Sequence, residues 1–165
     1  MIGGLGRAYV VPFAGVSVTA KQDFFYIKPA ADKPISVEWI EIAASGGTAD
    51  AGDAQEELFD LRLIRLPATV TVGSGGTAPT PTPLNPNDAA AGLTSRVNDT
   101  TVATTSGTAL TVHATAMNSR VPGVWLPAPE HRWLCANAQA IVFRLETTPA
   151  DAILLSGTMI VRELI

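Results

Sequence analysis

The stretch TAPTPTPLNPNDAAAG, residues 77–92, divides this chain of 165 residues almost in the middle. Its alternating threonines and prolines favour an extended, polyproline-like path without internal hydrogen bonds. Such a stretch is either a tether between two small domains or a long loop on one domain. Each flanking part is expected to hold roughly four short strands, too few to bury a stable core alone. The sequence therefore predicts one domain, residues 1–165, with an extended loop at residues 73–93 and an N-terminal arm at residues 1–6.

Short runs of β-branched and aromatic residues recur along the chain, separated by glycine and proline. In EELFDLRLIRLP, the apolar Phe59, Leu61 and Leu63 fall on one face of an extended chain and charged residues fall on the other. About eight such runs, spaced as in sandwiches and barrels, predict an all-β fold. We expect a two-sheet antiparallel β-sandwich, jelly-roll-like, with long Pro/Gly/Thr-rich loops. Helical pattern is limited to at most one or two short turns, in DAQEEL and NDAAAG.

The run PISVEWIEIAAS departs from simple alternation. Val37 and Trp39 fall on one face of an extended chain, whereas Ile40 and Ile42 fall on the opposite face. This change of phase predicts either a β-bulge or a strand that is buried on both faces.

The composition argues against several classes of protein. Charged residues form only 16% of the chain, well below the usual quarter, while hydrophobic residues form 47%. The surface must therefore be built from small polar residues or be buried against neighbouring subunits. The net charge of −4 and the scattered basic residues argue against nucleic-acid binding. Since no basic leader or long apolar run is present, we expect a soluble protein, made in the cytoplasm, without a membrane partner.

The residues capable of chemistry form no recognisable catalytic set, so we expect no enzymatic activity and no cofactor. A metal site of His113, His131 and Glu130 is disfavoured, because the adjacent Glu130 and His131 would point to opposite faces of a strand. The lone Cys135 in RWLCANA fits a buried, inert residue better than a nucleophile. The acidic run at residues 50–57 lacks the spacing of a calcium-binding EF-hand loop.

Two tryptophans flank the proline-rich segment LPAPEHR. Exposed there, Trp125 and Trp133 would be interface anchors or a platform for a glycan, whereas buried rings would belong to the core. Both interpretations stay open for these two residues. The residues expected to contact a partner are Thr80, Pro81, Thr82, Pro83, Trp125 and Trp133.

The stretch LRLIRLPATVTVGSGGTAPTPTPLNPNDAAAGLTSRVNDTTVATTSGTALTV resembles small proteins encoded beside the capsid gene of tailed bacteriophages. The resemblance continues through VWLPAPEHRW and AIVFRLETTPADAILLSGTMIVREL. It implies a capsid decoration (cement) protein or another minor head protein. Such a protein is a β-sandwich, often a homotrimer, that binds the major capsid protein on the outer surface of the virion and stabilises the capsid. The alternative is a carbohydrate- or receptor-binding β-sandwich module of a phage virion.

Overall fold

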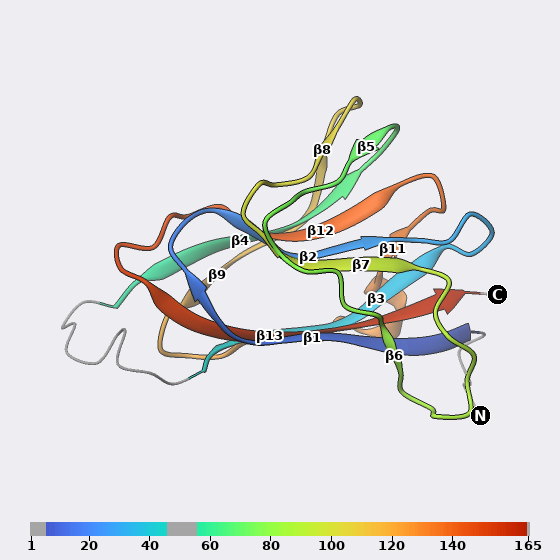
Figure 1. The fold of residues 1–165 in the computed structure, drawn as a ribbon, viewed down its shortest axis with the longest axis horizontal. Coiled ribbons are helices and arrows are strands. Elements are labelled where there is room, and N and C mark those ends of the chain that lie inside the picture. The colour runs from blue at the N-terminus through green and yellow to red at the C-terminus, as the bar shows by residue number, and fades with distance from the viewer. Residues whose placement is uncertain (1–5, 46–55, 165) are drawn as a thin grey trace.

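The computed structural model describes residues 6–45 and 56–164. Within these ranges the chain forms two main antiparallel sheets that face one another, and the 3-10 turn η1 (Pro129–His131) is the one helical element (Figure 1). The predicted all-β, two-sheet sandwich is therefore confirmed. The N-terminal arm lies outside the described residues apart from Gly6, which begins the first strand. The first half of the predicted turn in DAQEEL, residues 53–55, also lies outside them, and its last residue, Leu58, begins a strand.

Two main sheets and a small ribbon account for all the strands in these ranges. Sheet A has the order β10-β3-β13-β1-β6, with β11 also paired to β3, and sheet B has the order β7-β2-β12-β4-β9. The strands of sheet A are β1 (Gly6–Val18), β3 (Ile35–Ala44), β6 (Thr82–Pro83), β10 (Gly123–Trp125), β11 (Trp133–Cys135) and β13 (Ile153–Leu164). The strands of sheet B are β2 (Gln22–Lys28), β4 (Leu58–Leu66), β7 (Thr94–Asp99), β9 (Leu110–Asn118) and β12 (Ala140–Leu145). The ribbon consists of β5 (Val70–Thr71) and β8 (Thr104–Thr105).

The order of the long strands is that of a jelly roll. Strands β1, β2, β3 and β4 alternate between the two sheets, and β10, β12 and β13 do so again after β9. The last two strands enter the middle of the sheets, because β13 lies between β1 and β3 and β12 lies between β2 and β4. Residues 67–109 are an excursion inserted between the adjacent strands β4 and β9.

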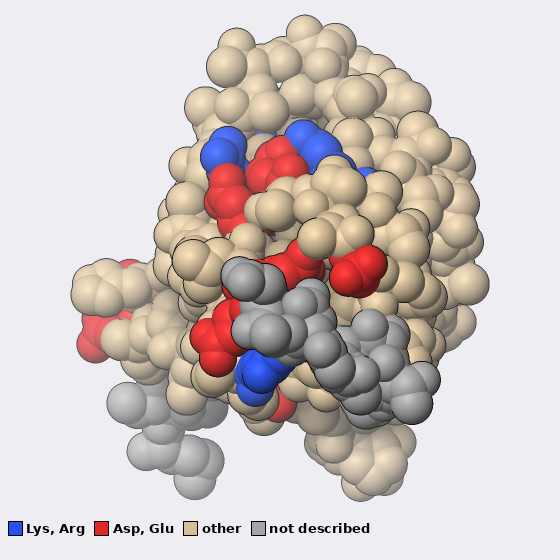
Figure 2. Space-filling model, turned by 90° about the vertical axis from the view of Figure 1, so that its left-hand side faces the viewer, with Lys and Arg blue, Asp and Glu red and all other residues tan. Residues whose placement is uncertain are grey.

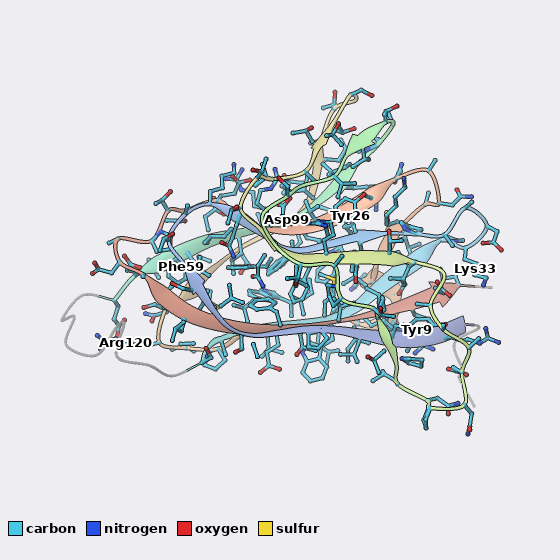
Figure 3. All side chains as sticks on the ribbon, in the orientation of Figure 1. Tyr9, Tyr26, Lys33, Phe59, Asp99 and Arg120 are labelled. Carbon is cyan, nitrogen blue, oxygen red and sulfur yellow. The ribbon has the colours of Figure 1, made fainter. Side chains whose placement is uncertain are left out.

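Side chains from both sides of residues 77–92 fill one interior (Figure 3). The buried cluster between the sheets includes Phe25 and Phe59 from the first part of the chain and Phe143 and Met159 from the last part. Because strands from the two parts alternate within each sheet, neither part can cover its apolar faces without the other.

A β-bulge in β3 explains the phase change in PISVEWIEIAAS. Val37 pairs with Val161 and Trp39 with Ile160, so Glu38 is the extra residue. Val37 and Ile40 both lie in the core. Of the two alternatives, the β-bulge is confirmed. The expectation that Trp39 shares the face of Val37 is wrong, since the bulge turns Trp39 to the outer side of sheet A.

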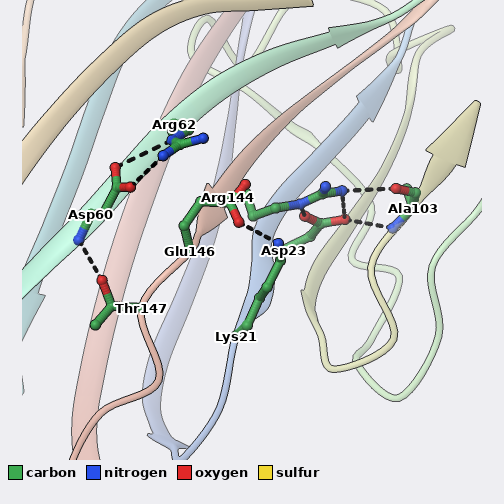
Figure 4. Close-up of polar contacts among 8 residues, drawn as sticks. All are labelled: Lys21, Asp23, Asp60, Arg62, Ala103, Arg144, Glu146 and Thr147. Atoms are coloured by element: carbon green, nitrogen blue, oxygen red, sulfur yellow. Dashed lines mark hydrogen bonds and ion pairs between the residues drawn. The ribbon is translucent and has the colours of Figure 1, made fainter. Parts of the chain in front are cut away.

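The excursion returns across the outer face of sheet B, where a buried ion pair holds it (Figure 4). Arg144 of β12 donates from Nε to Asp23 Oδ1 at 2.5 Å and from Nη2 to the Ala103 carbonyl at 2.8 Å. The Ala103 amide donates in turn to Asp23 Oδ2 at 2.7 Å. Burial raises the pKa of the Asp23 carboxyl above its ordinary value, and the Arg144 guanidinium opposes that shift.

We predict that Arg144→Met lowers the free energy of unfolding by about 3–5 kcal/mol, because it leaves the Asp23 carboxylate buried without its cation. Arg62→Met is the matched control, since Arg62 pairs with Asp60 at 2.7 Å on the exposed surface and its loss should change stability far less. Denaturant titration of both variants measures the difference. Equal losses of stability would contradict a structural role for the buried pair.

Candidate interaction surface

The proline-threonine stretch, residues 77–92, closes the edges of both sheets on one side of the sandwich. Thr77 and Val97 of β7 exchange both main-chain hydrogen bonds, at 3.0 and 2.9 Å. Farther along, β6 pairs with β1, and the Leu84 amide donates to the Ala8 carbonyl at 2.9 Å. A single segment of the chain therefore pairs with β7 of sheet B and with β1 of sheet A.

The sequence predicts that this stretch lies outside any strand and contacts a partner. In the structure Thr82 and Pro83 form β6, Pro81 is buried against its own chain, and Thr80 and Thr82 are exposed. The predicted partner contacts stay a prediction. Because the segment is paired with β1, only its outward-facing atoms are available for such contacts. Because proline lacks an amide hydrogen, the prolines here also limit the addition of a further strand.

The far end of the stretch is anchored at the end of the sandwich where Tyr9 lies (Figure 3). The buried carboxylate of Glu163 accepts hydrogen bonds from the amides of Gly92 and Leu93, each at 2.7 Å. The Tyr9 hydroxyl donates to the Ala89 carbonyl at 3.0 Å. The expected helical turn in NDAAAG is absent, and the Asp88 amide instead donates to the Asn85 carbonyl in a turn.

The opposite side of the sandwich is open. Strand β9 ends sheet B there, and β10 and β11, which both pair with β3, end sheet A, with no further strand of the described ranges beyond them. Five of the eight large apolar side chains that are strongly exposed gather at these edges or at β11, with exposed fractions of 46–74%. These five residues are Leu110, Val121, Val124, Leu126 and Leu134. Such a gathering on one side is typical of a surface that another molecule covers.

A groove of about 320 Å³ runs between β9 and β10 on this open side. Its lining is uncharged and consists of Ala116, Met117, Asn118, Val121, Pro122, Gly123, Val124 and Trp125. A Cβ at Gly123 would lie 2.4 Å from the Trp125 ring and 2.8 Å from Met117 Sδ. Glycine at this position therefore allows the two large side chains to form the floor of the groove.

The two tryptophans lie on the open side, but their rings pack inward against other side chains. The Trp125 ring is 5.0 Å from the Phe143 ring, the Trp133 ring is 5.0 Å from the His113 ring, and both indoles pack against the core. They lie at the edge of sheet A opposite to Thr82 and Pro83, so the structure does not bring the predicted contact residues together.

Sequence reasoning missed the outward neighbours of the two tryptophans. Val124 and Leu126 flank the half-buried Trp125, and Leu134 follows Trp133, each with more than half of its surface exposed. The alternation in VWL carries this signal, because a tryptophan that points inward turns its neighbours outward.

Among the described residues no charged side chain lines the groove, but Asp60 and Glu41 lie opposite its lining residues Ala116 and Val124 on the neighbouring strands. At the end of the molecule seen in Figure 2, acidic and basic groups lie next to one another. On the outer face of sheet B, Arg62 pairs with Asp60 and Lys21 pairs with Glu146 (Figure 4). The lining of the groove itself therefore offers apolar side chains and main-chain groups to a partner.

The described residues contain no group of three or more side chains placed to hold a metal ion. Burial lowers the pKa of His113, whose ring packs on Trp133, and raises the pKa of the buried Cys135 thiol to about 12. None of the described helical segments has the length and apolarity needed to cross a bilayer. No family model matches this chain, and neither a curated protein nor a solved structure shows significant similarity to it.

We predict that Cys135 does not react with a disulfide reagent such as DTNB at pH 8 while the chain is folded. Its thiol is buried and stays protonated far above that pH, whereas only the thiolate is nucleophilic. In guanidinium chloride the same thiol should react fully, which is the control. Rapid reaction of the folded chain would show that the β11 region opens readily.

We predict that Trp125→Ala lowers the free energy of unfolding by about 3 kcal/mol, because it removes a ring that packs on Phe143 and the core. Leu126→Ala is the control, since Leu126 is 74% exposed and touches little of the interior. Thermal and denaturant unfolding measure both. An unchanged stability of Trp125→Ala would contradict the packing of this ring on the core.

Proposed function

We propose that this chain is a structural virion protein: a decoration (cement) protein that binds the outer surface of a tailed-bacteriophage capsid and stabilises it. The resemblance of its sequence to proteins encoded beside phage capsid genes supplies the biological setting. The observation that carries the proposal physically is the open side of a charge-poor sandwich, where uncharged apolar residues flank a groove between two strand edges.

The opposite sides of the sandwich suit different tasks under this proposal. The proline-threonine stretch closes one side and protects it from unwanted strand pairing. The open side would face the major capsid protein. A homotrimer, which the resemblance implies, would present that side three times, so that modest contacts add up through effective concentration.

Neither glycan binding nor catalysis is favoured by a specific observation. A glycan platform requires free aromatic faces, whereas the rings of Trp125 and Trp133 pack against the core. A catalytic site requires ionisable groups with free polar atoms, but within the described ranges the buried carboxylates of Asp23, Asp99 and Glu163 accept main-chain amides. The buried carboxylate of Glu38 is paired with Arg132 and Arg162. The first three carboxylates stabilise loops.

The test is a pair of leucine-to-aspartate variants on the two sides of the sandwich. We predict that Leu126→Asp weakens binding to capsids assembled without this chain by about tenfold or more, because it places a charge in an apolar contact. Leu84→Asp is the matched control, since Leu84 is 52% exposed on the closed side. Co-sedimentation of the purified variants with the capsids measures occupancy.

The outcomes separate the two sides. Loss of binding with Leu84→Asp alone would assign capsid contact to the proline-threonine stretch. No binding of the unmodified chain to any capsid preparation would contradict the proposed function itself.

A further inference from the structure

The outer edge of β9 carries main-chain groups that point away from the protein. The main-chain groups of Asp60 point toward β12, because the Asp60 carbonyl accepts a hydrogen bond from the Glu146 amide. Since these groups alternate along a strand, those of Leu61 and Leu63 point toward β9. Leu61 pairs with Thr115 and Leu63 with His113. Since alternate residues of a strand point their amides to the same side, those of Ala114 and Ala116 face outward.

Small side chains leave this main chain accessible. Ala114 and Ala116 are exposed and carry only methyl groups. The Ala116 carbonyl receives a long contact of 3.5 Å from the Thr115 hydroxyl. Protected edges usually carry lysine, proline or a covering loop, as β7 does here, but β9 has no charged residue and no proline. The edge can therefore accept another strand.

The groove beside this edge determines what kind of strand enters. It is a notch between β9 and β10, closed at one end by the turn that joins them, where the Val121 amide donates to the Asn118 carbonyl at 3.1 Å. The edge of β9 forms one wall of the notch, and Met117 and Trp125 form its floor. An extended segment with uncharged, apolar side chains at alternate positions fits both features.

We propose that the notch between β9 and β10 binds an extended, uncharged segment of the capsid subunit, which adds to sheet B as a further strand beside β9. This inference rests on the proposed function and names the element of the partner that the open side accepts. The main-chain hydrogen bonds of Ala114 and Ala116 would hold the segment, and its alternate side chains would cover Val121, Val124 and Trp125.

A second copy of this chain fits the notch less well. Its β9 is already part of a sheet, so it would bring β4 and the rest of its sandwich with it. The notch ends at the turn of residues 119–122 and is bounded by β10 on the side away from β9. It therefore has room for a single strand that carries no further strand on its other edge. A flexible arm of another subunit has that freedom.

The experiment uses capsids assembled without this chain and two matched variants. Ala116→Pro removes the outward amide and leaves the ladder to β4 intact, because proline is tolerated on an edge strand whose amide faces solvent. We expect about tenfold weaker capsid binding or more, at unchanged thermal stability. Ala116→Ser keeps the amide and the size of the side chain, and should bind like the unmodified chain.

Hydrogen exchange gives a second readout that needs no substitution. With the unmodified chain bound to the same capsids, deuterium uptake at Ala114 and Ala116 should fall, while the chain alone should exchange rapidly there at every concentration. Capsid binding without this protection, or with full affinity for Ala116→Pro, would overturn the strand-addition proposal and leave the proposed function standing. Protection that grows with the concentration of the chain alone would assign the notch to a second copy. Absence of any capsid binding would contradict the proposed function instead.

Discussion

The main-chain hydrogen bonds of the proline-threonine stretch are the constraint on which the rest of the structure depends. Thr77 pairs with Val97 of sheet B, and Leu84 bonds to Ala8 of sheet A, so a few residues of chain join the edges of two sheets. The alternating threonines and prolines of residues 77–83 favour an extended path without internal hydrogen bonds, so their main chain is free to pair elsewhere. Closure of this side leaves β9 of sheet B and the short strands β10 and β11 of sheet A at the open edges of the two main sheets.

A chain with few charged residues uses several of them to hold this excursion in place. The carboxylates of Asp23, Asp99 and Glu163 are each at most 3% exposed. They accept the amides of Ala103, Gly76 and Leu93, all within or at the ends of the inserted loops. In a sequence alone, acidic residues of this kind are candidates for catalysis or metal binding. Here each carboxylate accepts hydrogen bonds from main-chain amides and stabilises the fold.

The sequence predicts the all-β sandwich because alternation, as at Phe59, Leu61 and Leu63, reports directly on which face of a strand is buried. It predicts the bulge in β3 from a change of phase, but not that the extra residue is Glu38, which decides the face of Trp39. Docking of residues 77–92 could not be predicted, since main-chain pairing leaves no signature in side chains. The open side was missed for the same reason, because strand neighbours depend on long-range topology.

The central claim is that the proline-threonine stretch is an integral part of the sandwich. Amide hydrogen exchange followed by NMR on the isolated chain tests it most directly. The account predicts that the amides of Thr77, Leu84 and Val97 exchange nearly as slowly as that of the core residue Phe143, since opening them exposes the edges of both sheets. Exchange of Thr77 and Leu84 at the rate of an unstructured peptide would contradict the account.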